Sequence, residues 1–285
     1  MAAAALPVRI GLALVLLAGA GSAADAAGPP RRVVSMNVCT DQMAMLVAAP
    51  GQLHSVSHVA SDPNSSALAA EAGAFVANRG SAEEIFLMRP DLVLAGTYTT
   101  RSTVALLRQL GIRVEEFAPE SSFDDIRENF QRMGEILGQP QRAAARMAEL
   151  DRRLAAIATD GHEGMTVAAW YANSYTSGSG TLVDAVIERA GLTNIADRLG
   201  YAGMARLPLE LLLMSAPDLL VTADRGYMAP ALAQQGFDHP AFRAQARLSG
   251  LVDIASRYTV CGAPFTAEAV RALAGGADAR GAPTR

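Results

Sequence analysis

Aromatic side chains are scarce in this chain, yet three of them gather in one short segment. Aromatic residues make up 5% of the sequence, whereas Trp170, Tyr171 and Tyr175 fall within six residues of one another. Flat aromatic faces with polar edges suit a large, partly apolar ligand. Trp170 ends a predicted strand, so a place in the hydrophobic core is the alternative for that residue. The segment predicts one wall of a ligand-binding cleft.

Two arginines could add charge recognition to that cleft. Arg79 and Arg101 each lie in a loop after a predicted strand. A guanidinium group forms bidentate hydrogen bonds with carboxylates, so each arginine could neutralise an anionic ligand. Surface arginines are usually only solvated, which is the alternative for both. The other candidate ligand contacts, all in loops of the same kind, are Asn37, Tyr98, Tyr201, Arg225 and Tyr227.

The histidines do not predict a site for a bare metal ion. The chain has four of them, His54, His58, His162 and His239. His54 and His58 are four residues apart, a spacing that brings side chains together on a helix, but His54 falls in a strand-like run. His162 lies in a turn flanked by glycines. We therefore expect no metal-ion site and no resident cofactor.

Composition limits the class of protein that these residues serve. The chain has 285 residues, of which 51% are hydrophobic and 18% charged, and its formal net charge is −4. This length suggests about two domains and allows a sizeable core. A disordered chain would be less hydrophobic and more highly charged, and a general nucleic-acid-binding protein would need a basic face. The sequence has no lysine, so its basic side chains are arginines.

The amino-terminal residues follow the order of regions in a secretory signal peptide. Arg9 precedes an apolar run over residues 10–20, and Ala24-Asp25-Ala26 supplies an A-x-A cleavage site. A membrane anchor is the alternative, but the run has about 11 residues and a membrane span needs roughly 20. We therefore assign residues 1–26 to a cleavable signal peptide. The mature protein is expected to be soluble and exported to an oxidising compartment.

Short aliphatic runs alternate with helical patterns along the mature chain. Residues 32–36 and 92–94 are predicted strands, and residues 101–109 form a predicted helix after the second of them. This alternation is typical of βαβ units in a mostly parallel sheet. Two helices in succession, 123–137 and 141–157, interrupt it before strands resume. We predict an α/β fold with two similar lobes that have mostly parallel sheets and are joined by a single long helix.

The predicted boundaries place the ligand cleft between the lobes. They are residues 31–138 for the amino-terminal lobe, 139–160 for the linker helix, 161–274 for the carboxy-terminal lobe and 275–285 for a disordered tail. Ligands bind parallel sheets at the carboxyl ends of the strands, and domain interfaces are favoured sites. The strand-end loops of the two lobes are therefore expected to face each other across one cleft.

The two cysteines are expected to form one disulfide. Exported proteins with two cysteines often pair them, and Cys39 and Cys261 are the only two in the chain. Cys39 follows the first strand, near the cleft, so the bond would tie the carboxy-terminal segment to the first lobe. Two cysteines are too few for a disulfide scaffold or a zinc finger. No histidine accompanies either of them in the sequence, so we do not expect a catalytic thiol.

The two halves of the chain repeat one pattern. Glu83 lies seven residues before Pro90, and Glu210 lies seven residues before Pro217. In both halves an aspartate follows the proline and an aliphatic strand follows the aspartate. Each strand then enters a polar loop that contains a tyrosine. The repeat supports two similar lobes.

These features together resemble a known family. The signal peptide, the run from Arg32 to Asn37, the run from Glu83 to Leu94 and the alanine-rich linker are similar to those of periplasmic substrate-binding proteins of ABC importers. The resemblance is to the helix-linked type, class III, which carries iron–siderophore complexes and cobalamin, and it covers residues 31–274. It implies a bilobed fold with a rigid interlobe helix and small opening motions. It also implies a periplasmic location and delivery of cargo to a membrane permease and its ATPase.

The resemblance implies a docking role for Glu83 and Glu210. In the family, one glutamate at the top of each lobe enters an arginine pocket of the permease, and these two residues occupy the matching positions. Each lies in the first turn of a predicted helix, where a carboxylate also complements the helix dipole. That purely structural role is the alternative.

The sequence favours a binding protein over an exported enzyme. It contains no nucleophile elbow, no G-x-G-x-x-G motif and no metal triad. We expect a metal chelate as cargo, with a ferric siderophore first, cobalamin second and haem third. An exported α/β enzyme is the remaining alternative. The protein is expected to act as a monomer that neither binds nucleic acid nor inserts into the membrane.

Overall fold

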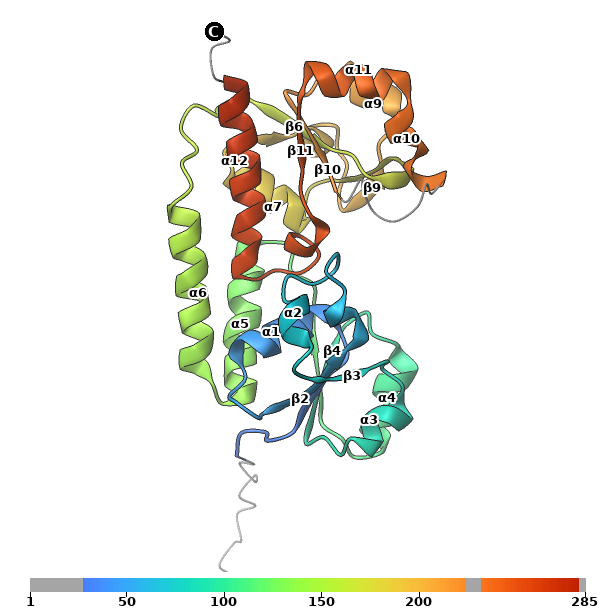
Figure 1. The fold of residues 1–285 in the computed structure, drawn as a ribbon, viewed down its shortest axis with the longest axis vertical. Helices are drawn as coiled ribbons and strands as arrows, with labels where there is room; N and C mark the ends of the chain where they lie inside the picture. The colour runs from blue at the N-terminus through green and yellow to red at the C-terminus, as the bar shows by residue number, and fades with distance from the viewer. Residues whose placement is uncertain (1–27, 224–231, 282–285) are drawn as a thin grey trace, which may run out of the picture.

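The computed structural model describes residues 28–223 and 232–281. The predicted signal peptide, residues 282–285 and the candidate contacts Arg225 and Tyr227 lie outside this part of the chain. Two α/β lobes follow one another along the long axis of the molecule, with helices along one side of both (Figure 1). The architecture is the two-lobed α/β fold predicted from the sequence. Within the described ranges, no helix is both long and apolar enough to cross a membrane.

The first lobe is built on a parallel sheet covered by helices on both faces. Its strands are β1 (Val33–Ser35), β2 (Leu53–Ser57), β3 (Val76–Asn78), β4 (Leu92–Gly96) and β5 (Val114–Phe117). Its helices are α1 (Val38–Val47), η1 (His58–Ser61), α2 (Ala69–Ala72), α3 (Ala82–Leu87), α4 (Arg101–Gln109) and α5 (Phe123–Leu137). The strand order is β3-β2-β1-β4-β5, and every pair is parallel. Successive side chains of a strand point to opposite faces. Val33 therefore joins the core cluster of α1 and α5, whereas Val34 joins that of α3 and α4.

The second lobe has a smaller parallel sheet and an added antiparallel ribbon. Its strands are β6 (Thr166–Ala169), β7 (Tyr175–Ser177), β8 (Thr193–Asn194), β9 (Met204–Arg206), β10 (Leu219–Thr222) and β11 (Gly250–Asp253). Its helices are η2 (Ala172–Ser174), α7 (Leu182–Arg189), α8 (Ile195–Arg198), α9 (Leu209–Met214), η3 (Leu232–Gln234), α10 (Gln235–Asp238), α11 (Pro240–Leu248), η4 (Ser256–Tyr258), η5 (Pro264–Thr266) and α12 (Ala267–Gly281). The main sheet has the order β11-β10-β6-β8, and β7 pairs with β9.

The sequence repeat corresponds to a repeat of hydrogen bonds in the two lobes. The Asp91 carboxylate accepts hydrogen bonds from the backbone N–H groups of Arg31 and Arg32, at 2.6 and 3.0 Å, just before β1. The Asp218 carboxylate accepts one from the Thr166 N–H, at 2.8 Å, at the start of β6. β4 and β10 then pair with β1 and β6 in parallel. Each aspartate thus fixes the start of the central strand of its lobe.

One helix, α6 (Pro140–Ala155), joins the lobes, as predicted, and it packs antiparallel to α5, the last helix of the first lobe. α5 ends at Gly138, whose φ of 67° lies in the left-handed region that favours glycine. The next helix, α6, has a proline in its first turn and returns beside α5 (Figure 1). A Cβ atom at Gly134 would lie 2.6 Å from the Ala143 side chain, so glycine permits this close packing. With 16 residues, α6 is about 24 Å long, and it leads from the first lobe to the second.

The prediction of a disordered tail is wrong for residues 275–281. These residues form the last turns of α12, which packs beside α6 and against β11. A Cβ atom at Gly276 would lie 2.5 Å from the Val252 side chain, and Ala277 is buried. The small residues that suggested disorder instead let the helix lie close to the sheet.

Candidate functional site

A pocket of about 480 Å³ opens at the carboxyl ends of the second-lobe strands. Residues after β6 form one wall, the β7–β9 ribbon forms a second, and a segment after β11 forms a third. This position agrees with the rule that parallel sheets bind ligands at the carboxyl ends of their strands. The lining residues are Tyr171, Ala172, Tyr175, Ser177, Val183, Met204, Ala223, Ser256, Thr259 and Val260.

Side chains of the β7–β9 ribbon alternate, so that one face of the ribbon turns to the pocket. Tyr175 is paired with Arg206, and Ser177 with Met204. The Arg206 guanidinium lies over the Tyr175 ring, 5.5 Å from its centroid. The Ser177 hydroxyl donates to the Met204 sulfur at 3.4 Å. Met204 is nevertheless 60% exposed, which leaves its thioether free to contact a ligand.

Tyr171 gives the pocket a neutral hydrogen-bonding group. Its backbone N–H donates to the Tyr175 carbonyl at 2.8 Å, which fixes the turn between β6 and β7. Burial raises the pKa of the Tyr171 phenol, and a hydrogen bond with Ser177 opposes this effect. The phenol is therefore uncharged at neutral pH.

The first lobe contributes a smaller hollow of about 50 Å³ at the ends of β1, β4 and β5. Tyr98 lies on its rim and is 88% exposed. The Asn37 side chain accepts hydrogen bonds from the N–H groups of Cys39 and Thr40, at 3.0 and 3.4 Å, and so caps α1. A Cβ atom at Gly96 would lie 3.0 Å from the Asn37 amide nitrogen. These contacts hold the Asn37 side chain at the strand ends.

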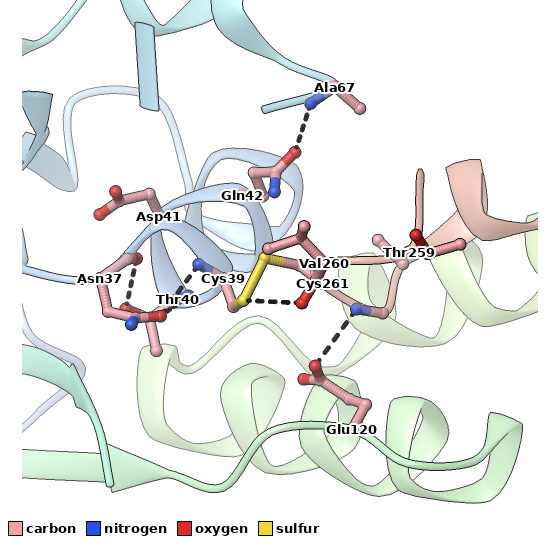
Figure 2. The surroundings of a disulfide bond; sticks show 12 residues. Asn37, Cys39, Thr40, Asp41, Gln42, Ala67, Glu120, Thr259, Val260 and Cys261 are labelled. Atoms are coloured by element: carbon pink, nitrogen blue, oxygen red, sulfur yellow. Dashed lines mark hydrogen bonds between the residues drawn. A yellow bond between two sulfur atoms is a disulfide. The ribbon is translucent and has the colours of Figure 1, made fainter. Parts of the chain in front are cut away.

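Cys39 and Cys261 form a disulfide, the pairing expected from the sequence. Figure 2 shows it joining the start of α1 to the segment that follows η4. In that segment the Gly262 N–H donates to the Glu120 carboxylate at 3.2 Å. Burial raises the pKa of Glu120, although its hydrogen bonds with Asn129 and Gly262 oppose this effect. Cys39 lines the first-lobe hollow, and Val260, the neighbour of Cys261, lines the second-lobe pocket, so the disulfide lies between the two.

The prediction that Trp170 contacts the ligand is wrong. Its side chain is 1% exposed, and its ring stacks on Phe242 with centroids 4.9 Å apart. Its indole N–H donates to the Leu207 carbonyl at 3.0 Å. The Trp170 backbone N–H donates to Val221 and so continues the strand. The pleat therefore turns Trp170 into the core and the next residue, Tyr171, to the pocket.

Three further predicted contacts lie apart from both hollows, as the described residues define them. Tyr201 packs against the same core cluster as Trp170, and its carbonyl accepts the Ser179 N–H at 3.0 Å. Arg79 and Arg101 are exposed, and neither lines the second-lobe pocket or the first-lobe hollow. Of the predicted ligand contacts, the structure brings Asn37, Tyr98, Tyr171 and Tyr175 to the strand ends that face the cleft.

Three of the four histidines have structural partners. The Arg32 guanidinium lies 2.8 Å from the His54 ring nitrogen. The His162 ring bonds both the Ala190 carbonyl and the Asp278 carboxylate at 2.9 Å. The His239 ring accepts the Ala241 N–H at 3.2 Å and caps α11. No group of three or more histidine, cysteine or acidic residues that could hold a metal occurs in the described ranges.

The two predicted docking residues occupy equivalent places in the lobes. Glu83 lies in the first turn of α3 and Glu210 in the first turn of α9, and both are exposed. Four residues further on, on the same face of each helix, Leu87 is 77% exposed and Met214 is 81% exposed. Each lobe thus presents an acidic and an apolar side chain next to one another.

Several pocket residues were not predicted from the sequence. They are Val183, Met204, Ser256, Thr259 and Val260. The last three belong to the segment that precedes Cys261. Because the sequence predicts a disulfide between Cys261 and the cleft residue Cys39, the neighbours of Cys261 could have been included.

A hollow of about 510 Å³ elsewhere on the first lobe is not a comparable candidate. It is lined by residues that include Arg31, Gln52 and Asp91, which lie at the amino-terminal ends of β1, β2 and β4. This is the edge of a parallel sheet opposite to the one that binds ligands.

Solved structures with the same fold bind different cargoes. The haem-binding protein RhuT from Roseiflexus sp. RS-1 has a TM-score of 0.71 at 22% identity and covers 88% of this chain and 98% of its own. The vitamin B12-binding protein BtuF of Vibrio cholerae has a TM-score of 0.67 at 19% identity, with the same coverages. An Fe3+-hydroxamate transport protein of Saccharomonospora viridis has a TM-score of 0.65 at 20% identity and covers 87% of this chain and 93% of its own. At these identities, the similarity shows the fold alone.

Two sequence comparisons are more specific. A cobalamin-binding protein of Halobacterium salinarum is 35% identical over 151 residues, which are 50% of this chain and 41% of that protein. The match therefore spans less than half the length of the curated relative. The family model described as periplasmic binding protein matches residues 33–249. This range is most of the chain, and the protein therefore belongs to the periplasmic binding protein family.

Proposed function

We propose that this protein binds a corrinoid of the cobalamin type in the periplasm and delivers it to an ABC permease. The observation that carries the proposal is the character of the second-lobe pocket. Among the described residues that line it, none is charged, and Tyr171, Tyr175 and Met204 supply aromatic, hydroxyl and thioether groups. A corrinoid is large and has a flat apolar ring with neutral amide edges, which matches such a surface. The cobalamin-binding relative supports the same cargo.

A ferric siderophore, the first choice from the sequence, is the second candidate. The observation that favours it is a pair of arginines near the pocket. The Arg206 guanidinium lies over Tyr175, and that of Arg257 lies over the Tyr258 ring, 5.0 Å from its centroid. A rotation of either side chain would bring positive charge to an anionic chelate. Arg79 and Arg101 do not support this candidate, because they lie away from the pocket.

Delivery to a permease is supported by the repeat of the two lobes. Glu83 and Glu210 are exposed at equivalent positions on α3 and α9. Two equivalent surfaces fit a partner that presents two equivalent receptors, as a permease made of two like subunits does. The family membership supports the same role and the periplasmic location.

Calorimetric titration of the mature protein tests the cargo. We expect saturable one-to-one binding of cyanocobalamin. Haemin and a ferric hydroxamate siderophore should bind with clearly lower affinity. Tyr175→Ala and Met204→Ala should each weaken binding roughly tenfold, the usual effect of removing a central contact. Arg79→Ala is the matched control and should leave affinity unchanged. Tight binding of the siderophore that is lost in Arg206→Ala would reassign the cargo to the second candidate.

A further inference from the structure

We infer that the Cys39–Cys261 disulfide is a positioning element of the ligand cleft, in that it holds the pocket residues Thr259 and Val260 against the first lobe. The inference deepens the proposed function and rests on it for the identity of the ligand. We call residues 256–263 the cross-lobe segment. The segment follows β11, so it belongs by sequence to the second lobe, yet its covalent attachment is to α1 of the first (Figure 2).

The cross-lobe segment forms one wall of the pocket. Ser256, Thr259 and Val260 all line it. Val260 is 51% exposed, whereas the next residue, Cys261, is 1% exposed. The chain therefore presents Val260 to the pocket while it buries the cysteine beside it. The Cys39 sulfur lies 3.7 Å from the Val260 carbonyl oxygen, and because a disulfide sulfur carries no proton, this is a packing contact rather than a hydrogen bond.

Three separate attachments join this segment to the first lobe. The disulfide links it to α1. The Gly262 N–H donates to the Glu120 carboxylate at 3.2 Å, and the Arg257 guanidinium donates to the Pro63 carbonyl at 3.2 Å. Arg257 is half-buried but its bond to Pro63 is exposed, so water can replace that bond. The Gly262–Glu120 hydrogen bond is buried, and the disulfide is the one covalent attachment of the three.

Tight packing behind Gly262 supports the positional role. A Cβ atom there would lie 2.4 Å from the Ile126 side chain of α5 and 3.0 Å from that of Glu120. The backbone can approach α5 this closely only because residue 262 is glycine. Cys261 is bonded to Cys39 and Gly262 packs against α5, so the two residues that follow Val260 are both held to the first lobe.

This attachment affects affinity through preorganisation. When the segment is tethered, Thr259 and Val260 are already ordered before the ligand binds. If the segment were a free loop, binding would have to order these two residues, and the lost conformational entropy would reduce the affinity. Ordering two side chains and their backbone weakens binding roughly tenfold. The same bond limits how far the cleft can open at this point, because α1 and the pocket wall move together.

The test is a double-mutant cycle in the full mature protein. Replacing both cysteines (Cys39→Ser with Cys261→Ser) should raise the Kd for cyanocobalamin roughly tenfold. Val260→Gly should weaken binding clearly when the disulfide is present and much less when it is absent. Val183→Ala is the matched control, because Val183 lines the same pocket from α7 and its effect should be equal in both backgrounds. A purely stabilising disulfide would leave the Kd unchanged or give additive effects for Val260, and either result would overturn the inference.

Amide hydrogen exchange provides a measurement that does not depend on the ligand. In the double-serine protein, the amides of residues 259–262 should exchange at least about tenfold faster, while those of β10 keep their protection. If the double-serine protein does not fold, the same comparison is made on the native protein before and after reduction with a phosphine. Failure of every chelate to bind the wild-type protein would refute the proposed function alone. Unchanged protection of residues 259–262 would refute the positioning role.

Discussion

Asp41 is a carboxyl group that is fully buried beneath the cleft-facing end of the first-lobe sheet. Its Oδ2 accepts the Ser57 N–H at 3.1 Å and the Ser57 hydroxyl at 2.5 Å. Its Oδ1 has no partner among the described residues, and neither has the Oδ1 of Asn78, which lies opposite Ser57 in the β2–β3 ladder. Burial raises the pKa of Asp41 to about 6, although the hydrogen bonds from the hydroxyl and backbone N–H of Ser57 oppose this effect.

This raised pKa makes stability depend on pH in a definite direction. Because the folded-state pKa lies above the unfolded value of 3.8, the folded protein binds more protons between pH 4 and pH 6, and stability falls as pH rises through that range. Asp41→Asn removes the ionisation. We expect it to be about 3 kcal/mol more stable than wild type at pH 7.5 and similar to wild type at pH 4.

Urea unfolding at a series of pH values between 4 and 7.5 measures this difference. Asp62→Asn is the matched control, because hydrogen bonds from Asn64 and Ser65 lower the pKa of Asp62. The ionised Asp62 carboxylate stabilises the folded protein at pH values above the unfolded pKa. Asp62→Asn removes this charge and should therefore destabilise the protein at neutral pH. If Asp41→Asn and wild type were equally stable at all pH values, the pKa of Asp41 would not be raised in the folded protein.

At the residue scale, the limit of the sequence lies in the pleat of a strand. The segment of Trp170, Tyr171 and Tyr175 was correctly placed at the end of β6. Adjacent residues in a strand face opposite sides, so Trp170 and Tyr171 could not both face the ligand. The residue that faces the ligand is determined by where the strand stops pairing with its neighbour. The last hydrogen bond of that pairing runs from the Trp170 N–H to the Val221 carbonyl, which is a tertiary contact that the sequence does not reveal.

At the element scale, α12 shows how composition can mislead. Glycine disfavours a helix in an isolated segment, but here Gly276 lets α12 lie close to Val252 of β11. The end of the helix is further fixed by Asp278, which binds the buried His162 ring. Burial alone would lower the pKa of His162, but its bonds to Ala190 and Asp278 raise it overall. Helices with clear ends, such as α4 and α5, were by contrast predicted with the bounds that the structure has.

Removing the Asp278 carboxylate should loosen the end of α12 in a pH-dependent way. A histidine with a raised folded pKa stabilises the protein below its unfolded pKa near 6.5, and the effect is lost as pH rises through the folded pKa. Asp278 is largely exposed, so the effect is modest. We expect Asp278→Ala to lower the Tm by about 2 °C at pH 5.5 and by less at pH 9.

Scanning calorimetry at the two pH values makes this measurement. Arg280→Ala, at an exposed position in the same last turns, is the control and should show no such dependence on pH. An equal loss of stability at both pH values would mean that Asp278 acts by helix packing rather than through the charge of His162.

At the scale of the whole molecule, the internal repeat was the most informative signal in the sequence. It predicted two lobes because the same helix, aspartate and strand recur in both halves, and the structure shows the same strand pairing in both. It could not predict what joins the lobes beyond the linker. Contacts such as Gly262 to Glu120 and Arg257 to Pro63 belong to neither copy of the repeat.

The repeat also leads to a prediction about the partner. Glu83 and Glu210 line neither the second-lobe pocket nor the first-lobe hollow, so a change of charge there should not alter cargo binding. The proposed docking uses both lobes at once, and if the partner receives each glutamate in an arginine pocket, reversing both charges would set like charges against each other. Glu83→Arg with Glu210→Arg should therefore abolish uptake of labelled cargo by cells while leaving the calorimetric Kd unchanged. The control, Glu71→Arg with Glu128→Arg, changes the net charge equally at two exposed sites and should preserve uptake. A loss of cargo affinity in the first variant would instead place these glutamates in the cleft, and preserved uptake would show that docking uses another surface.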